Sequence, residues 1–196
     1  MQPVANLVTG FLEDAREWSR GRQWPLRLLL WLWLAWLAFQ CTRDAAYSGF
    51  IDGLNLGVHE FGHLICSGFG QFVHVLGGSM VQCLVPLISF LMFHRQEDYF
   101  AFAFSLVWLG TNLHGVARYV ADARALQLDL VSPFGGDGEV IHDWNWLLGK
   151  VGWLQHDHEI AAVLRVLAIA CLWSGVAWGA CLLWRMMTTR DSAESR

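Results

Sequence analysis

Charged residues are scarce in this chain, which has a single lysine, Lys150, among its 196 residues. Asp, Glu, Lys and Arg together make up 15% of the sequence and 55% of it is hydrophobic, a balance that argues against an ordinary soluble domain. The formal net charge of −4 is too small to indicate a nucleic-acid partner. The composition therefore predicts a multi-pass integral membrane protein of the cell (inner) membrane, with the lipid bilayer as its main partner.

Paired cysteines are also lacking. The cysteines lie in or beside apolar segments without C-x-x-C spacing, which argues against a disulfide framework and against a thiolate zinc site. They are Cys41, Cys66, Cys83, Cys171 and Cys181. No small-residue cleavage site promptly follows the first apolar run, so residues 1–24 are not a cleavable signal peptide. Their apolar residues recur at helical spacing opposite a charged face, which predicts an amphipathic helix on the membrane surface.

Apolar runs, by contrast, are abundant, and we expect about five of them to be transmembrane helices. They are 25–41, 49–72, 80–94, 99–123 and 160–184. The predicted fold is all-α, a polytopic membrane helix bundle. Its membrane-embedded domain extends over residues 25–187, contains a long polar connection at 125–158, and is followed by a disordered tail at 188–196.

The second apolar run carries the motif His59-Glu60-Phe61-Gly62-His63, which has the form H-E-x-x-H. On a helix, residues at i and i+4 share a face, so the imidazoles of His59 and His63 can reach one metal ion together. Glu60 projects about 100° round from His59, close enough to contact a water on that metal. Ionisable groups are costly in mid-bilayer and are retained there mainly for function. The pattern predicts a catalytic Zn²⁺ site with one protein ligand still to be found.

Polar and small residues earlier in the same run suggest how the motif is supported. Asp52 and Asn55 fall near the His59 face, where they are either partners that orient an imidazole or a polar cap near the membrane surface. Gly49, Gly53 and Gly57 recur every four residues, a pattern that favours close approach of another helix. Both features place the motif within a packed bundle.

Two later segments contain further polar groups. Gly77-Gly78-Ser79 is predicted to open the segment Met80–His94, in which Pro86 kinks or breaks the helix. The Gly-rich entrance and Gln82 indicate either exposed backbone beside a substrate groove or an ordinary kinked helix with a buried Gln. In the following run, His114, Arg118 and Asp122 share one helical face. Arg118 and Asp122 can pair at this spacing. We expect His114 to support the site rather than to bind metal, because intramembrane ionisable groups usually have a pairing partner.

The membrane-embedded His59-Glu60-Phe61-Gly62-His63 motif, followed by a Gly-rich polar segment, resembles the site-2 protease family of intramembrane zinc metalloproteases. The resemblance covers roughly residues 49–90 and is specific at the zinc motif. It implies zinc held by His59 and His63, with Glu60 as the base. It also implies that Gly77-Gly78-Ser79 and Gln82 lie near the substrate.

The third ligand is where the sequence departs from that family, whose members use an Asp in an Asp-Gly motif on a later membrane helix. The downstream Asp-Gly here is Asp137-Gly138, in polar rather than apolar surroundings. Five residues on stands His142, followed by Asp143, and His, Asp and Glu all complete catalytic zinc sites. We predict His142 as the third ligand, with Asp137 and then Asp143 as the alternatives, so the chain is expected to be a divergent member of the family.

The predicted activity is hydrolysis of a peptide bond in a membrane-associated protein or peptide substrate, with Glu60 as general base toward a zinc-activated water. A zinc enzyme that cuts a lipid or a small amide would have an identical metal site. A haem protein with His63 and His114 as axial ligands would have no use for Glu60. A non-catalytic bundle is the remaining alternative.

Overall fold

A computed structural model describes the backbone of residues 2–129 and 141–194 and the side chains of residues 9–129 and 141–188. Within these residues the fold is all-helical, without a β-strand, as predicted. The α-helices are α1 (Gln2–Ser19), α2 (Pro25–Arg43), α3 (Phe50–Cys66), α4 (Gln71–Arg95), α5 (Tyr99–Ala121), α6 (Asp143–Val151) and α7 (Asp157–Glu194). Two short 3₁₀ turns, η1 (Ser67–Phe69) and η2 (Leu154–His156), precede α4 and α7.

Among the described residues, four helical segments are long and apolar enough to cross a membrane. They are Pro25–Arg43, Gln71–Arg95, Tyr99–Ala121 and Leu154–Thr188. These segments correspond to four of the five expected spans and favour an integral membrane protein. The remaining expected span is α3, which carries the H-E-x-x-H motif and is 17 residues long, short for a helix that crosses the bilayer unaided.

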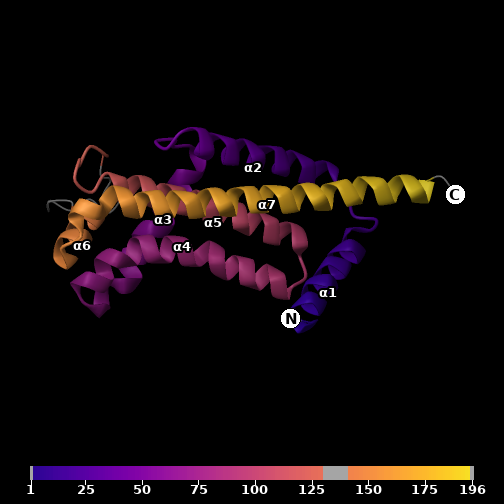
Figure 1. Cartoon of the computed structure of the whole chain (residues 1–196), viewed down its shortest axis with the longest axis horizontal. Helices are drawn as coiled ribbons and strands as arrows, with labels where there is room; N and C mark the ends of the chain where they lie inside the picture. Colours follow the sequence, from indigo (N-terminus) through magenta and orange to yellow (C-terminus); the bar gives the residue numbers. More distant parts are fainter. Residues whose placement is uncertain (1, 130–140, 195–196) are drawn as a thin grey trace.

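Helix α5 packs against both α7 and α4, and α4 also packs against α3. Figure 1 shows α7 running the length of the molecule, with α2 on one side and α3 and α4 on the other. The helices α6 and α1 lie at opposite ends. Phe11 of α1 stacks on Trp178 of α7 with ring centroids 5.3 Å apart, and Ala15 of α1 is buried. This packing fits the predicted amphipathic helix, while the side chains of residues 1–8 lie outside the described part.

Glycines set the closest helix contacts, although not the ones that we expected. A Cβ atom on Gly175 of α7 would lie 2.7 Å from the Ala103 carbonyl oxygen of α5, so the two helices touch through their backbones. Gly53 and Gly57 of α3 have open space where a Cβ would be. The predicted approach of another helix to that ladder is therefore absent from the described part of the chain, and α3 packs on α4 through Gly62 instead.

The start of α4 also differs from the prediction. Gly77 and Gly78 lie inside this helix, which begins at Gln71, rather than in a loop before it. Pro86 is accommodated within the helix. Tight packing against α3 explains why a pair of glycines sits in a helix interior, where each costs about 1 kcal/mol relative to alanine. At the other end of the chain, α7 continues to Glu194, where a disordered tail from residue 188 was expected.

Candidate metal centre

The helix α3 presents the H-E-x-x-H motif at the end nearer to α6. Its first turn is fixed by Asp52, whose Oδ2 accepts a hydrogen bond from the Gly49 backbone N–H at 2.7 Å. Asp52 is therefore a helix cap and does not orient an imidazole. Asn55 is buried, and its Oδ1 accepts a hydrogen bond from Trp108 Nε1 at 3.0 Å. Both side chains hold α3 in place without contacting the histidines through a hydrogen bond.

The next helix, α4, approaches α3 so closely that glycine is required at the contact. A Cβ atom on Gly62 would collide with the carbonyl oxygen of Gly77. A Cβ atom on Gly78 would lie 2.5 Å from His59 Nε2 and 2.6 Å from His63 Nε2. The backbone of α4 thus packs directly against the Nε2 atoms of the two imidazoles. This close contact leaves no room for a side chain and explains why residues 77 and 78 are both glycine.

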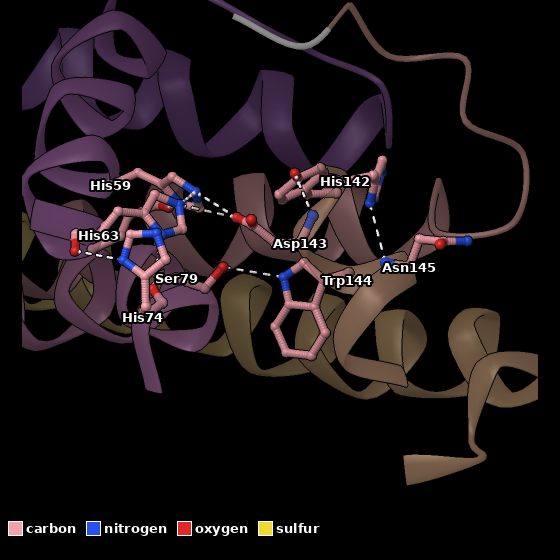
Figure 2. Close-up of polar contacts among 10 residues, drawn as sticks. His59, His63, His74, Ser79, His142, Asp143, Trp144 and Asn145 are labelled. Carbon is pink, nitrogen blue, oxygen red and sulfur yellow. Dashed lines mark hydrogen bonds and ion pairs between the residues drawn. The ribbon is translucent and has the colours of Figure 1, made fainter. Parts of the chain in front are cut away.

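Three side-chain atoms from α3 and α6 meet at one point. His59 Nε2 lies 3.0 Å from His63 Nε2 and 3.0 Å from Asp143 Oδ2, and His63 Nε2 lies 3.1 Å from the same oxygen. Figure 2 shows the two rings and the carboxylate converging from opposite sides. The three atoms form a nearly equilateral triangle, although Asp143 is separated from His59 by 84 positions in the sequence.

Hydrogen bonds at the other ring nitrogens fix how the two histidines are protonated. His59 Nδ1 lies 3.0 Å from Gln82 Oε1, and His63 Nδ1 lies 2.8 Å from the backbone carbonyl oxygen of His74. Oxygen atoms of this kind only accept, so both Nδ1 atoms carry the proton. In the neutral rings, both Nε2 atoms then direct lone pairs at each other and at the Asp143 carboxylate.

Three acceptors that face one another repel unless a cation lies among them. A proton satisfies two of the three atoms at a time, whereas a metal ion binds all three. Zn²⁺ bonds to imidazole nitrogen and carboxylate oxygen at about 2.0–2.2 Å, which places neighbouring atoms of a tetrahedral site about 3.3 Å apart. The measured separations of 3.0–3.1 Å approach that value. The donor set of two histidines and one carboxylate therefore fits a catalytic zinc ion.

Asp143 is positioned by two hydrogen bonds at the start of α6. Its backbone N–H donates to the hydroxyl of Tyr119 at 3.0 Å, and the neighbouring Trp144 Nε1 donates to Ser79 Oγ of α4 at 3.1 Å (Figure 2). Burial raises the pKa of the Asp143 carboxyl, but a protonated His59 or His63 that donates to it outweighs this effect, and the net pKa is lowered. Asp143 is therefore ionised, which is the form that binds metal.

The structure does not bring His142, the predicted third ligand, to the histidine pair. His142 is the N-cap of α6: its Nδ1 accepts a hydrogen bond from the Asn145 backbone N–H at 3.2 Å. Its Nε2 lies 3.3 Å from Asp122 Oδ2. Burial lowers the pKa of His142, so the ring is neutral and serves as a cap. Asp137, the next alternative, lies outside the described residues.

His114 and Arg118 of α5 have hydrogen-bond partners other than the histidine pair. His114 is buried, with Nε2 3.2 Å from the Tyr47 carbonyl oxygen. Arg118 Nη1 donates to that same oxygen at 2.9 Å instead of pairing with Asp122 as predicted. Asp122 accepts from the backbone N–H groups of Gln127 and Leu128. His114 and Arg118 thus tie the loop before α3 to α5, which is a supporting role.

A cavity of about 710 Å³ borders the metal cluster and extends along α3. Glu60 lines it together with both histidines, and its carboxylate lies within 4.8 Å of their nitrogen atoms. Leu56, Leu64 and Val75 supply apolar wall, and Asp52 stands at the far end. The cluster thus has one open side, and Glu60 stands at it, which is the arrangement that hydrolysis requires.

Two residues in direct contact with the histidines were not assigned this role from sequence. Gln82 accepts from His59 Nδ1, whereas the sequence indicated only a polar amide beside a groove. His74 and His63 bond reciprocally, since His74 Nδ1 also lies 2.9 Å from the His63 carbonyl oxygen. The Gly62–Gly77 contact sets the register of α4 on α3 and so creates both pairs.

We expect Gln82→Leu to lower zinc affinity by about 10–100-fold, because removing the group that accepts from a ligating histidine loosens its ring. Gln82→Glu should restore most of the affinity, since a carboxylate also accepts from His59 Nδ1. Competition with a chelator of known affinity measures both variants. Equal zinc affinity in the Leu variant and the wild type would contradict this role for Gln82.

Comparison of the chain with protein-family models, curated proteins and solved structures finds no match. The resemblance to the site-2 proteases therefore depends on the motif residues themselves. The function is argued from the geometry of the site.

Proposed function

We propose that this protein is a membrane-embedded, zinc-dependent peptidase of the site-2 protease type. The observation that carries the proposal is the triangle of His59 Nε2, His63 Nε2 and Asp143 Oδ2, three acceptors within 3.1 Å of one another. These residues would hold the metal. When bound, zinc lowers the pKa of a water and polarises a substrate carbonyl.

Glu60 performs the proton transfers in this proposal. Its carboxylate, at the open side of the cluster, takes a proton from the water as the oxygen attacks the amide carbon. It then returns that proton to the nitrogen of the breaking C–N bond, so that the amine leaves neutral. Gln82 and His74 hold the imidazoles in the orientation that the site needs.

The proposed setting is the lipid bilayer of a cell (inner) membrane, with α3 as a short fifth membrane helix between the first and second of the long ones. Its outer face supports this placement, because Phe50, Leu54 and Phe61 are all more than half exposed. A single apolar side chain on a surface is ordinary, but a whole exposed helix face is typical of contact with lipid. The proposed substrate is accordingly a membrane-borne peptide segment.

The first test measures zinc in detergent-purified protein by mass spectrometry. We expect about one zinc per chain in the wild type and a nearly complete loss in Asp143→Ala. The matched control is His142→Asn, which keeps a capping side chain at the neighbouring position and should keep its zinc. A wild type without zinc, under conditions that do not strip metals, would overturn the proposal; loss of zinc in the control alone would identify His142 as the ligand.

A zinc hydrolase that cuts a lipid or a small amide is the second candidate, and the cavity favours it. Its volume of about 710 Å³ lies within the range of small-molecule sites. Profiling the purified protein against quenched peptides and lipid amides separates the two. The haem alternative has less support, because His63 Nε2 faces His59 and Asp143 whereas His114 Nε2 faces the Tyr47 carbonyl oxygen, so the two rings do not point into one site.

A further inference from the structure

A tyrosine hydroxyl beside the metal cluster has a proton without an acceptor. Tyr119 of α5 lines the same cavity as Glu60, and its hydroxyl oxygen accepts a hydrogen bond from the Asp143 backbone N–H at 3.0 Å. A phenol carries one donor besides its acceptor sites. Among the described residues no partner accepts that proton, so the O–H bond is available to a molecule in the cavity.

The position of this hydroxyl is fixed before any substrate arrives. The Tyr119 ring lies between two imidazoles, with centroids 6.0 Å from His59 and 4.3 Å from His142. With the Asp143 N–H as a third anchor, the ring is held against the residues that form the metal cluster. A donor that is already oriented stabilises developing charge without the cost of reorganisation.

Hydrolysis of an amide creates such a charge. As the water oxygen bonds to the carbonyl carbon and its proton passes to Glu60, the π electrons of the carbonyl move onto oxygen. Gln82 uses its Oε1 to accept from His59, and Arg118 uses its Nη1 to donate to the backbone carbonyls of Ala46 and Tyr47. Tyr119 hydrogen-bonds directly to the backbone of Asp143, a proposed metal ligand, and, among the described residues, its own O–H donor is free to bond a molecule in the cavity.

We propose that Tyr119 is a catalytic residue that donates a hydrogen bond to the oxyanion of the tetrahedral intermediate. This inference rests on the proposed function of the same site. It differs from a merely structural role, in which Tyr119 would act through the Asp143 backbone and its loss would weaken the metal site. The two roles predict different results when the hydroxyl is removed.

The test compares zinc-loaded, detergent-purified wild type with Tyr119→Phe, using two inhibitor probes and calorimetry. One probe is an apolar phosphonamidate dipeptide, whose tetrahedral anion imitates the intermediate. The other is a dipeptide thiol, which binds zinc through sulfur and offers no oxygen in that position. We expect Tyr119→Phe to keep about one zinc, to bind the phosphonamidate about 10–100-fold more weakly, and to bind the thiol as the wild type does.

Tyr99→Phe is the matched control, because Tyr99 lies in the aromatic cluster near α1 at the opposite end of the bundle; it should bind both probes normally. Equal phosphonamidate binding by wild type and Tyr119→Phe would overturn the inference. Loss of zinc in Tyr119→Phe would also overturn it, in favour of a positioning role. A wild type that binds no zinc would instead contradict the proposed function of the site. Failure of the inference about Tyr119 can therefore be distinguished from failure of the proposed function.

Discussion

Glu60→Gln is expected to lose about 10²–10⁴-fold in the rate of peptide hydrolysis while retaining about one zinc per chain. The substitution keeps the size of the side chain and removes its ability to accept a proton. Glu60 stands within 4.8 Å of the histidine nitrogens but is absent from the triangle of metal-binding atoms. This variant should therefore keep its zinc and lose the proton transfer.

The measurement uses a quenched fluorescent peptide with an apolar segment of about 20 residues, reconstituted with the protein in liposomes. Zinc is determined on the same preparation. Glu13→Gln on the exposed side of α1 makes the same chemical change far from the site and should cleave normally. Cleavage by Glu60→Gln at the wild-type rate would rule out the mechanism, whereas loss of zinc in that variant would make Glu60 a ligand.

The second large effect is expected from one added methyl group, in Gly78→Ala. The new Cβ would lie 2.5 Å from His59 Nε2 and 2.6 Å from His63 Nε2, in space that the two metal-binding nitrogens occupy. The rings cannot simply retreat, since their Nδ1 atoms are bonded to Gln82 and to the His74 carbonyl. Nor can α4 shift freely, because Gly62 and Gly77 already touch. We expect zinc affinity to fall by at least about 100-fold.

Gly57→Ala is the control for this experiment. It makes the same substitution in α3, at a position with open space around the new Cβ. Both changes raise helix propensity by about 1 kcal/mol, so a weaker helix cannot explain a loss of zinc. Chelator competition and circular dichroism on both variants decide the matter. Unchanged zinc affinity in Gly78→Ala would show that the imidazoles do not bind metal in the arrangement described.

Sequence alone located the paired histidines and Glu60 because their relation is local. Spacing of four residues on a helix fixes which side chains share a face, whatever the rest of the chain does. The same holds for Pro25 at the start of α2 and for the four long apolar helices. Features that depend on one helix alone were accessible to sequence analysis.

Asp143, the proposed third ligand, was harder to identify because its contact with His59 spans 84 positions of the sequence. His142 and Asp143 are adjacent and chemically equivalent as zinc ligands. What separates them is the direction of the chain at the start of α6: the cap residue turns its ring back to Asn145, and the next side chain points to α3. No spacing rule in the sequence records that direction.

The glycines illustrate the same limit. Gly53 and Gly57 have the spacing that favours helix contact, yet the described helices leave them uncovered, and Gly62, Gly77 and Gly78 form the contact that matters. Which small residues meet depends on the relative register of two helices. That register is a property of the packed bundle.

The separation of the ligands along the chain also sets an order of events during synthesis. At about 5–20 residues per second, the ribosome needs roughly 4–17 s to make the 84 residues between His59 and Asp143. Throughout that interval the nascent chain holds His59, Glu60 and His63, but not the carboxylate that completes the triangle. Assembly of the proposed centre therefore waits for α6, and if the proposed function is right, the growing chain is hydrolytically inert until α6 is made.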